Sequence, residues 1–382
     1  ADSRRSTILY VIFGGVMMDC VTVYNSKTLD AVAMVTQLTS MEWTLRHYDV
    51  GSFELHLPFS AQNAEALTVG AVITHGSKSG IIRYIKAEEG IGGTELTVMG
   101  HTLQGLCSDR IIVPPFYYMT GTIDPLYSYD RIKGNGESVI KHYVTMHVTE
   151  ATDEDRRIAH FTIDENLGRG PASVAWQAKF TPLSDELAAI GRFVGLGWGV
   201  WLDEENKKYR FDVVPGLDRT VNQSDLPPVI FSRAYKSLQS GSYTYDSLSA
   251  VNTVYTRGNG EEEEQFVDKI ANGTGIDRRE GTTAVSSDDV TEVRDGGTAF
   301  LKENAAKETI EAEDSGRFTY RTDWSLGDYV TVRVAMPGEV LTLDKQITEV
   351  REVYNRGETK IEPVFGEKKE SLIKKMKKEW YK

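Results

Sequence analysis

The segment from residue 325 to residue 366 constrains the fold of this chain more than any other part of it. Between Tyr329 and Val334, apolar and polar side chains alternate, and similar patterns occur in residues 340–343, 347–354 and 358–366. A period of two is typical of strands with one buried face. Gly-Asp, Pro-Gly and Arg-Gly pairs separate these segments as turn signals. We therefore predict four short strands in a small barrel or meander; a barrel has no exposed edges at which to aggregate.

The bulk composition is that of an ordinary globular protein. The chain has 382 residues, which is enough for two or three domains. Of these residues, 40% are hydrophobic and 26% are charged. No apolar run reaches the length of a membrane span. Cys20 and Cys107 are the only cysteines, too few for a disulfide framework or a four-cysteine zinc site. We interpret both as small core residues of a protein made in a reducing compartment.

The charge of the chain argues against general nucleic-acid binding. The net charge is −13, whereas a protein that binds phosphates regardless of sequence needs a basic surface. Residues 367–382 hold seven Lys and three Glu, a local charge of +4 that leaves −17 for the remainder. The acidity either aids solubility or lets DNA slide through a channel without sticking, and charge alone favours solubility.

The first residues have two possible origins. Arg4-Arg5 followed by an apolar run is similar to a short signal peptide, but Asp19-Cys20 offers no small-residue cleavage site. Alternatively, Gly14-Gly15 is a translated ribosome-binding sequence that precedes a start codon at Met17 or Met18. We therefore expect residues 1–18 to be a leader or an N-terminal extension.

The rest of the chain divides into regions with different patterns of apolar and turn-forming residues. Residues 19–115 contain short alternating segments separated by glycines, which predicts a first antiparallel β-barrel, completed by residues about 216–257. A Pro-rich, aromatic linker at residues 111–129 leads into residues 116–215. They continue with two helical patterns, one from Gly136 and one capped by Ser184 or Asp185 and ended by Gly195 or Gly197. A hairpin over residues 198–213 completes this inserted α+β domain.

The last part is predicted to be a second β-barrel over residues 258–366. It carries a helical and loop insertion at about 262–318, with a flexible stretch at 268–298 and a helix at Ala299–Glu313. Residues 367–382 form a basic C-terminal helix. The predicted fold class is mainly β with α+β elements: two small antiparallel β-barrel domains flank an inserted α/β domain.

Polar groups that suggest chemistry have plainer explanations. His142 and His147 are five residues apart, off the i, i+4 spacing of a helical metal pair, which favours packing. The acids at 153–155 and 164–166 do not match a calcium loop and are interpreted as solvated loop acids. The Gly-rich residues 133–138 precede a helix, where anions bind, but lack a P-loop pattern, so capping is favoured.

No nucleophile has a recognisable set of partners either. Cys107 is close to His101 in sequence, but no third member of a triad follows. Residues 76–80 have Lys where a nucleophile elbow needs Ser. Sequons at Asn222 and Asn272 matter only in a secretory protein. We predict no catalytic, cofactor-binding or metal-binding residue and no cofactor.

The order of the β motifs resembles a known family. The C-terminal segments 325–332, 347–354 and 361–366 carry the resemblance, together with N-terminal segments at 51–58, 80–85 and 96–103 and the hairpin entry at 194–200. These motifs are similar to those of the siphophage or prophage tail hub proteins, also called baseplate hub or tail-associated proteins. That family in turn resembles the central hub of contractile tails.

The resemblance implies a structural virion protein with a defined place in the tail. Three copies would form a ring whose six β-barrels meet the tail tube, the distal tail protein or the tape-measure protein on one side. A tail tip, spike or fibre protein, used in host attachment, would follow on the other. DNA would pass the lumen without specific binding. Some relatives carry a fused cell-wall hydrolase, which this chain does not show after residue 366, so no enzyme activity is expected.

Two other functions stay open at this point. A pair of carboxylates brought together by the fold would support a tail-associated peptidoglycan hydrolase or endopeptidase. The 18 Tyr and 6 Trp residues would also suit a carbohydrate-binding module, although core packing accounts for most aromatic side chains.

Overall fold

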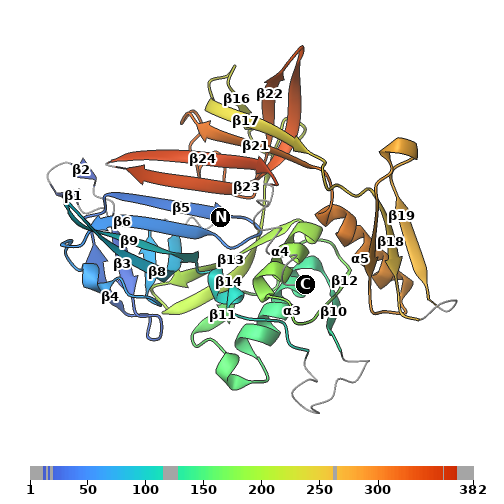
Figure 1. Ribbon diagram of the computed structural model, residues 1–382, viewed down its shortest axis with the longest axis horizontal. Coiled ribbons are helices and arrows are strands. Elements are labelled where there is room, and N and C mark those ends of the chain that lie inside the picture. The colour runs from blue at the N-terminus through green and yellow to red at the C-terminus, as the bar shows by residue number, and fades with distance from the viewer. Residues whose placement is uncertain are drawn as a thin grey trace. The chain divides into compact units, whose positions relative to one another are not determined.

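The computed structural model in Figure 1 describes residues 12–13, 16–17, 20–114, 128–260, 265–355 and 357–367. Several predictions lie outside these residues: most of the N-terminal extension, most of the linker after Pro114 and the basic C-terminal helix. The chain forms two compact units. Unit 1 extends to Pro215 and includes Val350–Ile361, and unit 2 comprises Gly216–Glu349 and continues from Glu362.

Unit 1 contains an extended antiparallel sheet whose core face is apolar. Phe53, Leu55 and Leu57 alternate with polar residues along one strand, and all three are buried. Trp43 packs on Phe53 with ring centroids 5.0 Å apart. The strand order is β23-β5-β6-β9-β8-β7-β3-β4. The strands are β3 (Val21–Tyr24), β4 (Ala31–Val35), β5 (Ser40–Arg46), β6 (Ser52–Pro58), β7 (Val72–His75), β8 (Lys78–Gly90), β9 (Gly93–Thr102) and β23 (Glu339–Asn355), while β1 (Ile12–Phe13) and β2 (Val16–Met17) form a separate pair.

The prediction of closed barrels does not hold for the described strands. The strand path of unit 1 ends at β4, which pairs only with β3. The 3-10 turn η1 (Ala64–Ala66) packs against β4, and Asn63 before it donates a 2.8 Å hydrogen bond to the Met34 carbonyl. A loop therefore protects this edge where a barrel would use another strand. The predicted mainly β character with several antiparallel sheets is confirmed.

The predicted helices and hairpin of the α+β region are present in unit 1. The N-cap of α4 is Pro182, without a side-chain cap, so Ser184 and Asp185 lie inside the helix; Gly195 ends α4 at φ 73°. The elements are α1 (Gly105–Ser108), β10 (Asp130–Gly134), α3 (Gly136–Val144), the π-helical turn η3 (Thr145–Thr149), η4 (Glu154–Arg156), β11 (Phe161–Ile163), β12 (Val174–Ala178), α4 (Leu183–Val194), β13 (Leu196–Asp203) and β14 (Lys208–Pro215).

Unit 2 has its own sheet and aromatic core. The strand order is β17-β21-β24-β23-β22, and β15 and β16 pair with β22. Phe231 lies 4.9 Å from Phe365 and 5.5 Å from Trp324 between ring centroids. The elements are β15 (Asp218–Arg219), β16 (Ile230–Ser232), β17 (Leu238–Asp246), β18 (Thr253–Arg257), β19 (Val267–Ala271), η6 (Gly275–Asp277), β20 (Glu280–Ala284), α5 (Val290–Glu303), β21 (Lys307–Asp314), β22 (Tyr329–Met336) and β24 (Glu358–Gly366).

Three local predictions in unit 2 were wrong. Residues 268–298 are not a flexible stretch but form β19, β20 and most of α5. The helix expected at 299–313 ends at Glu303, and Lys307–Asp314 is instead strand β21, because it pairs with β17 some sixty positions earlier. The two segments expected at 340–343 and 347–354 form one strand, β23, because Asp344 and Lys345 continue the ladder with β22.

Candidate functional site

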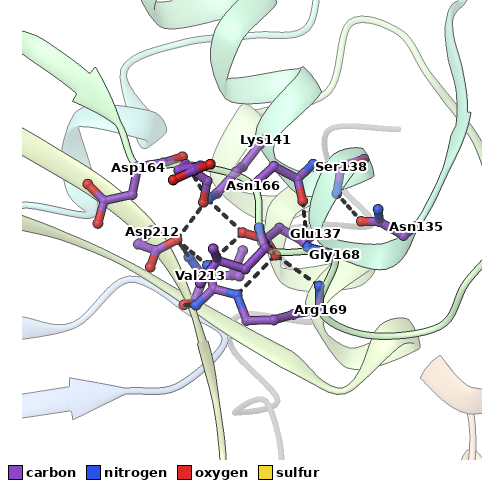
Figure 2. Close-up of polar contacts among 12 residues, drawn as sticks. Asn135, Glu137, Ser138, Lys141, Asp164, Asn166, Gly168, Arg169, Asp212 and Val213 are labelled. Carbon is purple, nitrogen blue, oxygen red and sulfur yellow. Dashed lines mark hydrogen bonds and ion pairs between the residues drawn. The ribbon is translucent and has the colours of Figure 1, made fainter. Parts of the chain in front are cut away.

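The most connected polar cluster described in the chain lies between α3 and β14 (Figure 2). Glu137, in the first turn of α3, is completely buried. Its Oε1 accepts from Arg169 Nη2 at 2.6 Å and pairs with Lys141 Nζ at 2.7 Å. Its Oε2 accepts from the backbone N–H groups of Leu167 and Arg169, at 3.1 and 2.9 Å, and from Arg169 Nε at 3.0 Å. Asp212 of β14 completes the cluster, 2.5 Å from Arg169 and 2.9 Å from Lys141.

This cluster has the chemistry of a structural centre. Burial pushes the pKa of Glu137 upward, but the hydrogen bonds from Arg169 and Lys141 outweigh burial and hold this pKa far below its ordinary value. The hydrogen bond to Glu137 in turn raises the pKa of Arg169. An always ionised carboxylate with five donors around it does not exchange protons near neutral pH. The cluster ties α3 to β14 and to the loop before β12.

The backbone N–H groups at the start of α3 already have acceptors within the protein. Asn135 Oδ1 accepts from the N–H of Ser138 at 2.8 Å, which confirms the interpretation of residues 133–138 as a helix cap. The N–H groups of Gly136 and Glu137 donate to the carbonyls of Pro171 and Arg169. These contacts leave the first turn of α3 poorly suited to an anion.

Asp164 of the following loop is held by an ion pair, contrary to its interpretation as a solvated acid, whereas Glu165 and the acids at 153–155 are exposed, as expected. Asp164 accepts from Arg210 Nε at 2.8 and 2.9 Å. The backbone carbonyls of Asp164 and Glu165 each accept from Lys141 Nζ at 2.8 Å, and Asn166 donates to Ser138 Oγ at 2.7 Å. The loop is thus held to α3 and β14 by polar contacts.

His142 and His147 do share one side of their helix, which the spacing argument missed. The helix changes from α to π geometry at η3, and Glu150 N–H donates to the Thr145 carbonyl at 2.7 Å, five residues back. A π turn holds more residues than an α turn, so residues five apart come to lie on one side of the helix. His142 Nε2 therefore lies 2.7 Å from Asp130 Oδ1, and His147 Nε2 lies 2.8 Å from Asp130 Oδ2.

Asp130 is the centre of this second cluster. Burial pushes the pKa of Asp130 upward, but the hydrogen bonds from His142 and His147 together lower it below the ordinary value. His147 is buried, and its Nδ1 has no hydrogen-bond partner among the residues that the structure describes. Within the described ranges, no group of three His, Cys, Asp or Glu side chains is suited to a metal ion. The three residues fasten the start of β10 to the end of α3.

Cys107 does not have the properties of a nucleophile. It lies on α1 and is completely buried. Burial raises the pKa of the Cys107 thiol to about 12. The reactive form of cysteine is the thiolate, so this thiol is inert near neutral pH and packs as a core residue, as the sequence predicted.

A buried ion pair joins two distant segments within unit 1. Lys78 Nζ at the start of β8 donates to Glu352 Oε2 of β23 at 2.5 Å and to Tyr354 Oη at 2.7 Å. Lys78 and Glu352 are 6% and 3% exposed. Nothing in the sequence marks this pair, because the partners are 274 positions apart. The contact holds the late strand β23 against the N-terminal sheet.

The buried side chain of His47 is expected to make the free energy of unfolding depend on pH. Burial lowers the pKa of His47 from its ordinary 6.5 to about 4. Between pH 6.5 and 4 the unfolded chain therefore binds a proton at His47 that the folded chain does not bind. The contribution of His47 to the free energy of unfolding is fully present above pH 6.5 and is lost as the pH falls. We expect unit 1 to lose about 2 kcal/mol of unfolding free energy between pH 7 and 5 through this group.

Urea unfolding at each pH measures this effect. A His47→Gln variant should show a shallower pH dependence over the same window, whatever its stability at pH 7. Identical slopes for wild type and His47→Gln would contradict the assignment.

Among the described helices, none combines the length and the apolar character needed to cross a membrane.

The fold has counterparts among solved structures. The tail protein from Neisseria meningitidis MC58 matches with a TM-score of 0.55 and 15% identity, over 91% of this chain and 96% of that one. Prophage tail protein gp18 from Listeria monocytogenes EGD-e matches with a TM-score of 0.55 and 11% identity, over 94% and 97%. The 43 kDa tail protein of prophage MuSo2 from Shewanella oneidensis matches with a TM-score of 0.55 and 10% identity, over 91% and 98%. At these identities the likeness establishes a shared fold.

The sequence itself also matches a family model. No curated protein matched the chain. The model of the siphovirus ReqiPepy6 Gp37-like proteins, in contrast, matches residues 20–367. This range includes both units, and the resemblance to siphophage tail proteins seen in the sequence is confirmed. The chain belongs to the family of siphovirus ReqiPepy6 Gp37-like proteins.

Proposed function

We propose that this protein is a structural component of the phage tail that closes into a trimeric hub ring. The observation that carries the proposal is the family match over residues 20–367, together with a fold shared with three tail proteins over more than nine-tenths of each chain. The same family supports a location in the virion tail.

The roles of the buried polar groups support a structural function. Glu137 and Asp130 are each saturated by cationic or imidazole donors, and Cys107 is buried as a thiol. A general acid or base needs a proton that it can exchange near the working pH. None of these groups favours the hydrolase alternative, and we assign no catalytic residue.

The two units of each chain would let a ring of three copies match a sixfold partner. Three copies with two β units each present six β modules, which matches a sixfold tail tube. Such rings close through interfaces that repeat around an axis. Permanent interfaces of this kind bury roughly 2,000 Å² or more. The ring would join the tail tube, distal tail protein or tape-measure protein to a tip, spike or fibre protein, and DNA would pass its lumen.

The oligomeric state tests this proposal. We expect mass photometry of the purified chain, alone or mixed with a distal tail protein, to show three copies per particle. Chemical crosslinking followed by denaturing electrophoresis should give a ladder that ends at the trimer. A chain that stays monomeric in both conditions contradicts the ring.

The basic segment at residues 367–382 is proposed to dock the next component of the tip. Its charge of +4 contrasts with the acidic remainder of the chain, so an acidic partner surface is expected to attract it. Deleting residues 368–382 should leave the trimer intact by mass photometry but abolish co-purification with the tip protein. Loss of the trimer on deletion would contradict this role and place the segment in ring closure.

A further inference from the structure

Strands β11, β13 and β14 form a three-stranded sheet (Figure 1) whose two faces differ in polarity. Trp198 and Phe211 belong to one face and are buried in the core of unit 1. Because side chains alternate along a strand, Trp201 and Arg210 belong to the other face. Trp201 lies opposite Arg210 in the register, and Arg210 lies opposite Thr162. We call Trp201, Arg210 and Thr162 the outer row; it crosses all three strands over roughly 10 Å.

The indole of Trp201 rests on its own strand. A Cβ atom added to Gly199, two residues earlier, would lie only 2.4 Å from Cζ2 and 2.6 Å from Cη2 of Trp201. The indole therefore fills the space above Gly199 that a larger residue would occupy. Trp201 is nevertheless 38% exposed, so the indole is held in one place and still reaches solvent. A side chain that is already in place loses little conformational entropy when a ligand packs against it.

An oriented ion pair lies across from this indole. Asp164 accepts from Arg210 Nε at 2.8 and 2.9 Å and from Arg210 Nη2 at 2.5 Å. The side chain of Arg210 is 54% exposed. A guanidinium has about five N–H donors, and a carboxylate accepts about four hydrogen bonds. The pair therefore presents further donors and acceptors to a ligand, in a geometry that the two side chains fix for each other.

The neighbours of Trp201 favour a sugar over a protein or a nucleic acid. Arg210 lies directly opposite, and Lys208 and Asp212 are diagonal neighbours on the same face. The centre of a protein interface is depleted of charged residues, so an aromatic side chain with charged neighbours does not suit one. Asp164 balances Arg210, and the chain has a net charge of −13, which argues against a phosphate backbone as the ligand.

The outer row combines the two kinds of contact that a pyranose sugar makes. A sugar with equatorial hydroxyls exposes C–H groups on the faces of its ring, and these pack against an indole through apolar and dispersion contacts. Its hydroxyls project from the ring edge, and each both donates and accepts. The donors of Arg210 beside the acceptors of Asp164 match two adjacent hydroxyls, because one hydroxyl receives a hydrogen bond while the other gives one. A charge on the ligand is not required.

We propose that the outer row binds a neutral, β-linked glycan. One pyranose unit packs on Trp201, and adjacent hydroxyls of the glycan accept from Arg210 and donate to Asp164. The site lies entirely within unit 1 and goes beyond the proposed structural role, since it needs no second copy of the chain. A chain that stays monomeric yet binds the glycan would refute the trimeric ring and leave this site in place.

Isothermal titration calorimetry with the full chain tests the proposal. The probes are cellotetraose and chitotetraose, two neutral oligosaccharides of β-linked sugars with equatorial hydroxyls. We expect saturable binding of at least one of them. Its affinity should change less than about twofold between about 50 and 500 mM NaCl, because salt screens interactions between charges. Absence of binding by both oligosaccharides at about 10 mM would overturn the proposal.

Variants of the outer row locate the site. W201A should weaken binding at least about tenfold, which corresponds to the loss of one aromatic contact, whereas W201F keeps an aromatic ring and should lose less. R210Q should weaken binding about fivefold, because hydrogen bonds from a charged donor are lost. Phe59 is another exposed aromatic residue of unit 1, at 61%, and F59A should bind like wild type. Circular dichroism confirms that each variant is folded.

A change at Gly199 separates the position of the indole from its presence. The Cβ atom of G199A would displace the Trp201 side chain from the sheet, so binding should fall about as much as in W201A. Gly92 provides the matched control, because among the described residues nothing but its chain neighbours lies within 4 Å of an added Cβ. G92A should therefore bind like wild type.

Other results would contradict the site. Equal binding by wild type and W201A would exclude Trp201 as a contact, and an equal loss in F59A would show that the effect is not local. Unchanged binding by G199A would show that the placement of Trp201 on the sheet does not matter. Binding of a tetralysine peptide through Trp201 without binding of either oligosaccharide would identify a protein-binding surface instead.

Discussion

Replacing Glu137 with alanine is expected to lower the free energy of unfolding of unit 1 by about 3–5 kcal/mol. The carboxylate is completely buried and holds Arg169 and Lys141, which are themselves 20% and 7% exposed at their side chains. Removing it leaves buried positive charge without its main counter-ion, and this costs more than the intact pair contributes. Urea-induced unfolding followed by circular dichroism measures the change.

A surface pair provides the matched control. Glu154→Ala also removes a glutamate from an ion pair, with Arg157, but the Glu154 side chain is 82% exposed. Water and salt screen such a pair, so we expect a loss of less than about 0.5 kcal/mol. If Glu137→Ala lost no more than Glu154→Ala, the cluster in Figure 2 would not be the centre that holds α3 to β14.

Replacing Phe231 with alanine is expected to destabilise unit 2 by about 3–5 kcal/mol. Phe231 is completely buried, and its ring contacts those of Phe318, Trp324 and Phe365, with centroids 5.8, 5.5 and 4.9 Å away. The loss combines the transfer of apolar surface with the cavity left among the remaining rings. Urea unfolding monitored by tryptophan fluorescence reports the change.

An exposed phenylalanine of the same unit serves as the comparison. Phe266 is 38% exposed, so Phe266→Ala should cost less than about 1 kcal/mol. Phe231→Leu fills part of the cavity and should fall between the two alanine variants. Equal losses for Phe231→Ala and Phe266→Ala would show that the aromatic cluster does not organise the core of unit 2.

Local patterns in the sequence were sufficient to predict those strands and helices whose structure is decided by neighbouring residues along the chain. The β6 strand and the β13–β14 hairpin follow from alternation and turn residues, and α4 follows from its apolar face and Gly195. The resemblance to tail proteins followed from the order of these motifs. The pattern failed at Lys307–Asp314, because pairing with β17 overrides a local helical preference.

The polar clusters could not be predicted from the sequence for a different reason. Glu137 and Arg169 are 32 positions apart, Arg169 and Asp212 are 43 positions apart, and Lys78 meets Glu352 across 274 positions. No periodicity links residues so far apart. His142 and His147 were close in sequence, yet the spacing rule for an α-helix excluded them because it assumes no π turn.

The sequence alone determined the mainly β character, the family and the places of most strands and helices, because side-chain periodicity and turn chemistry act over a few residues. The tertiary structure alone decided which charged groups are paired and that the described sheets stay open. These properties depend on contacts between distant segments, whose energies exist only once the chain has brought them together.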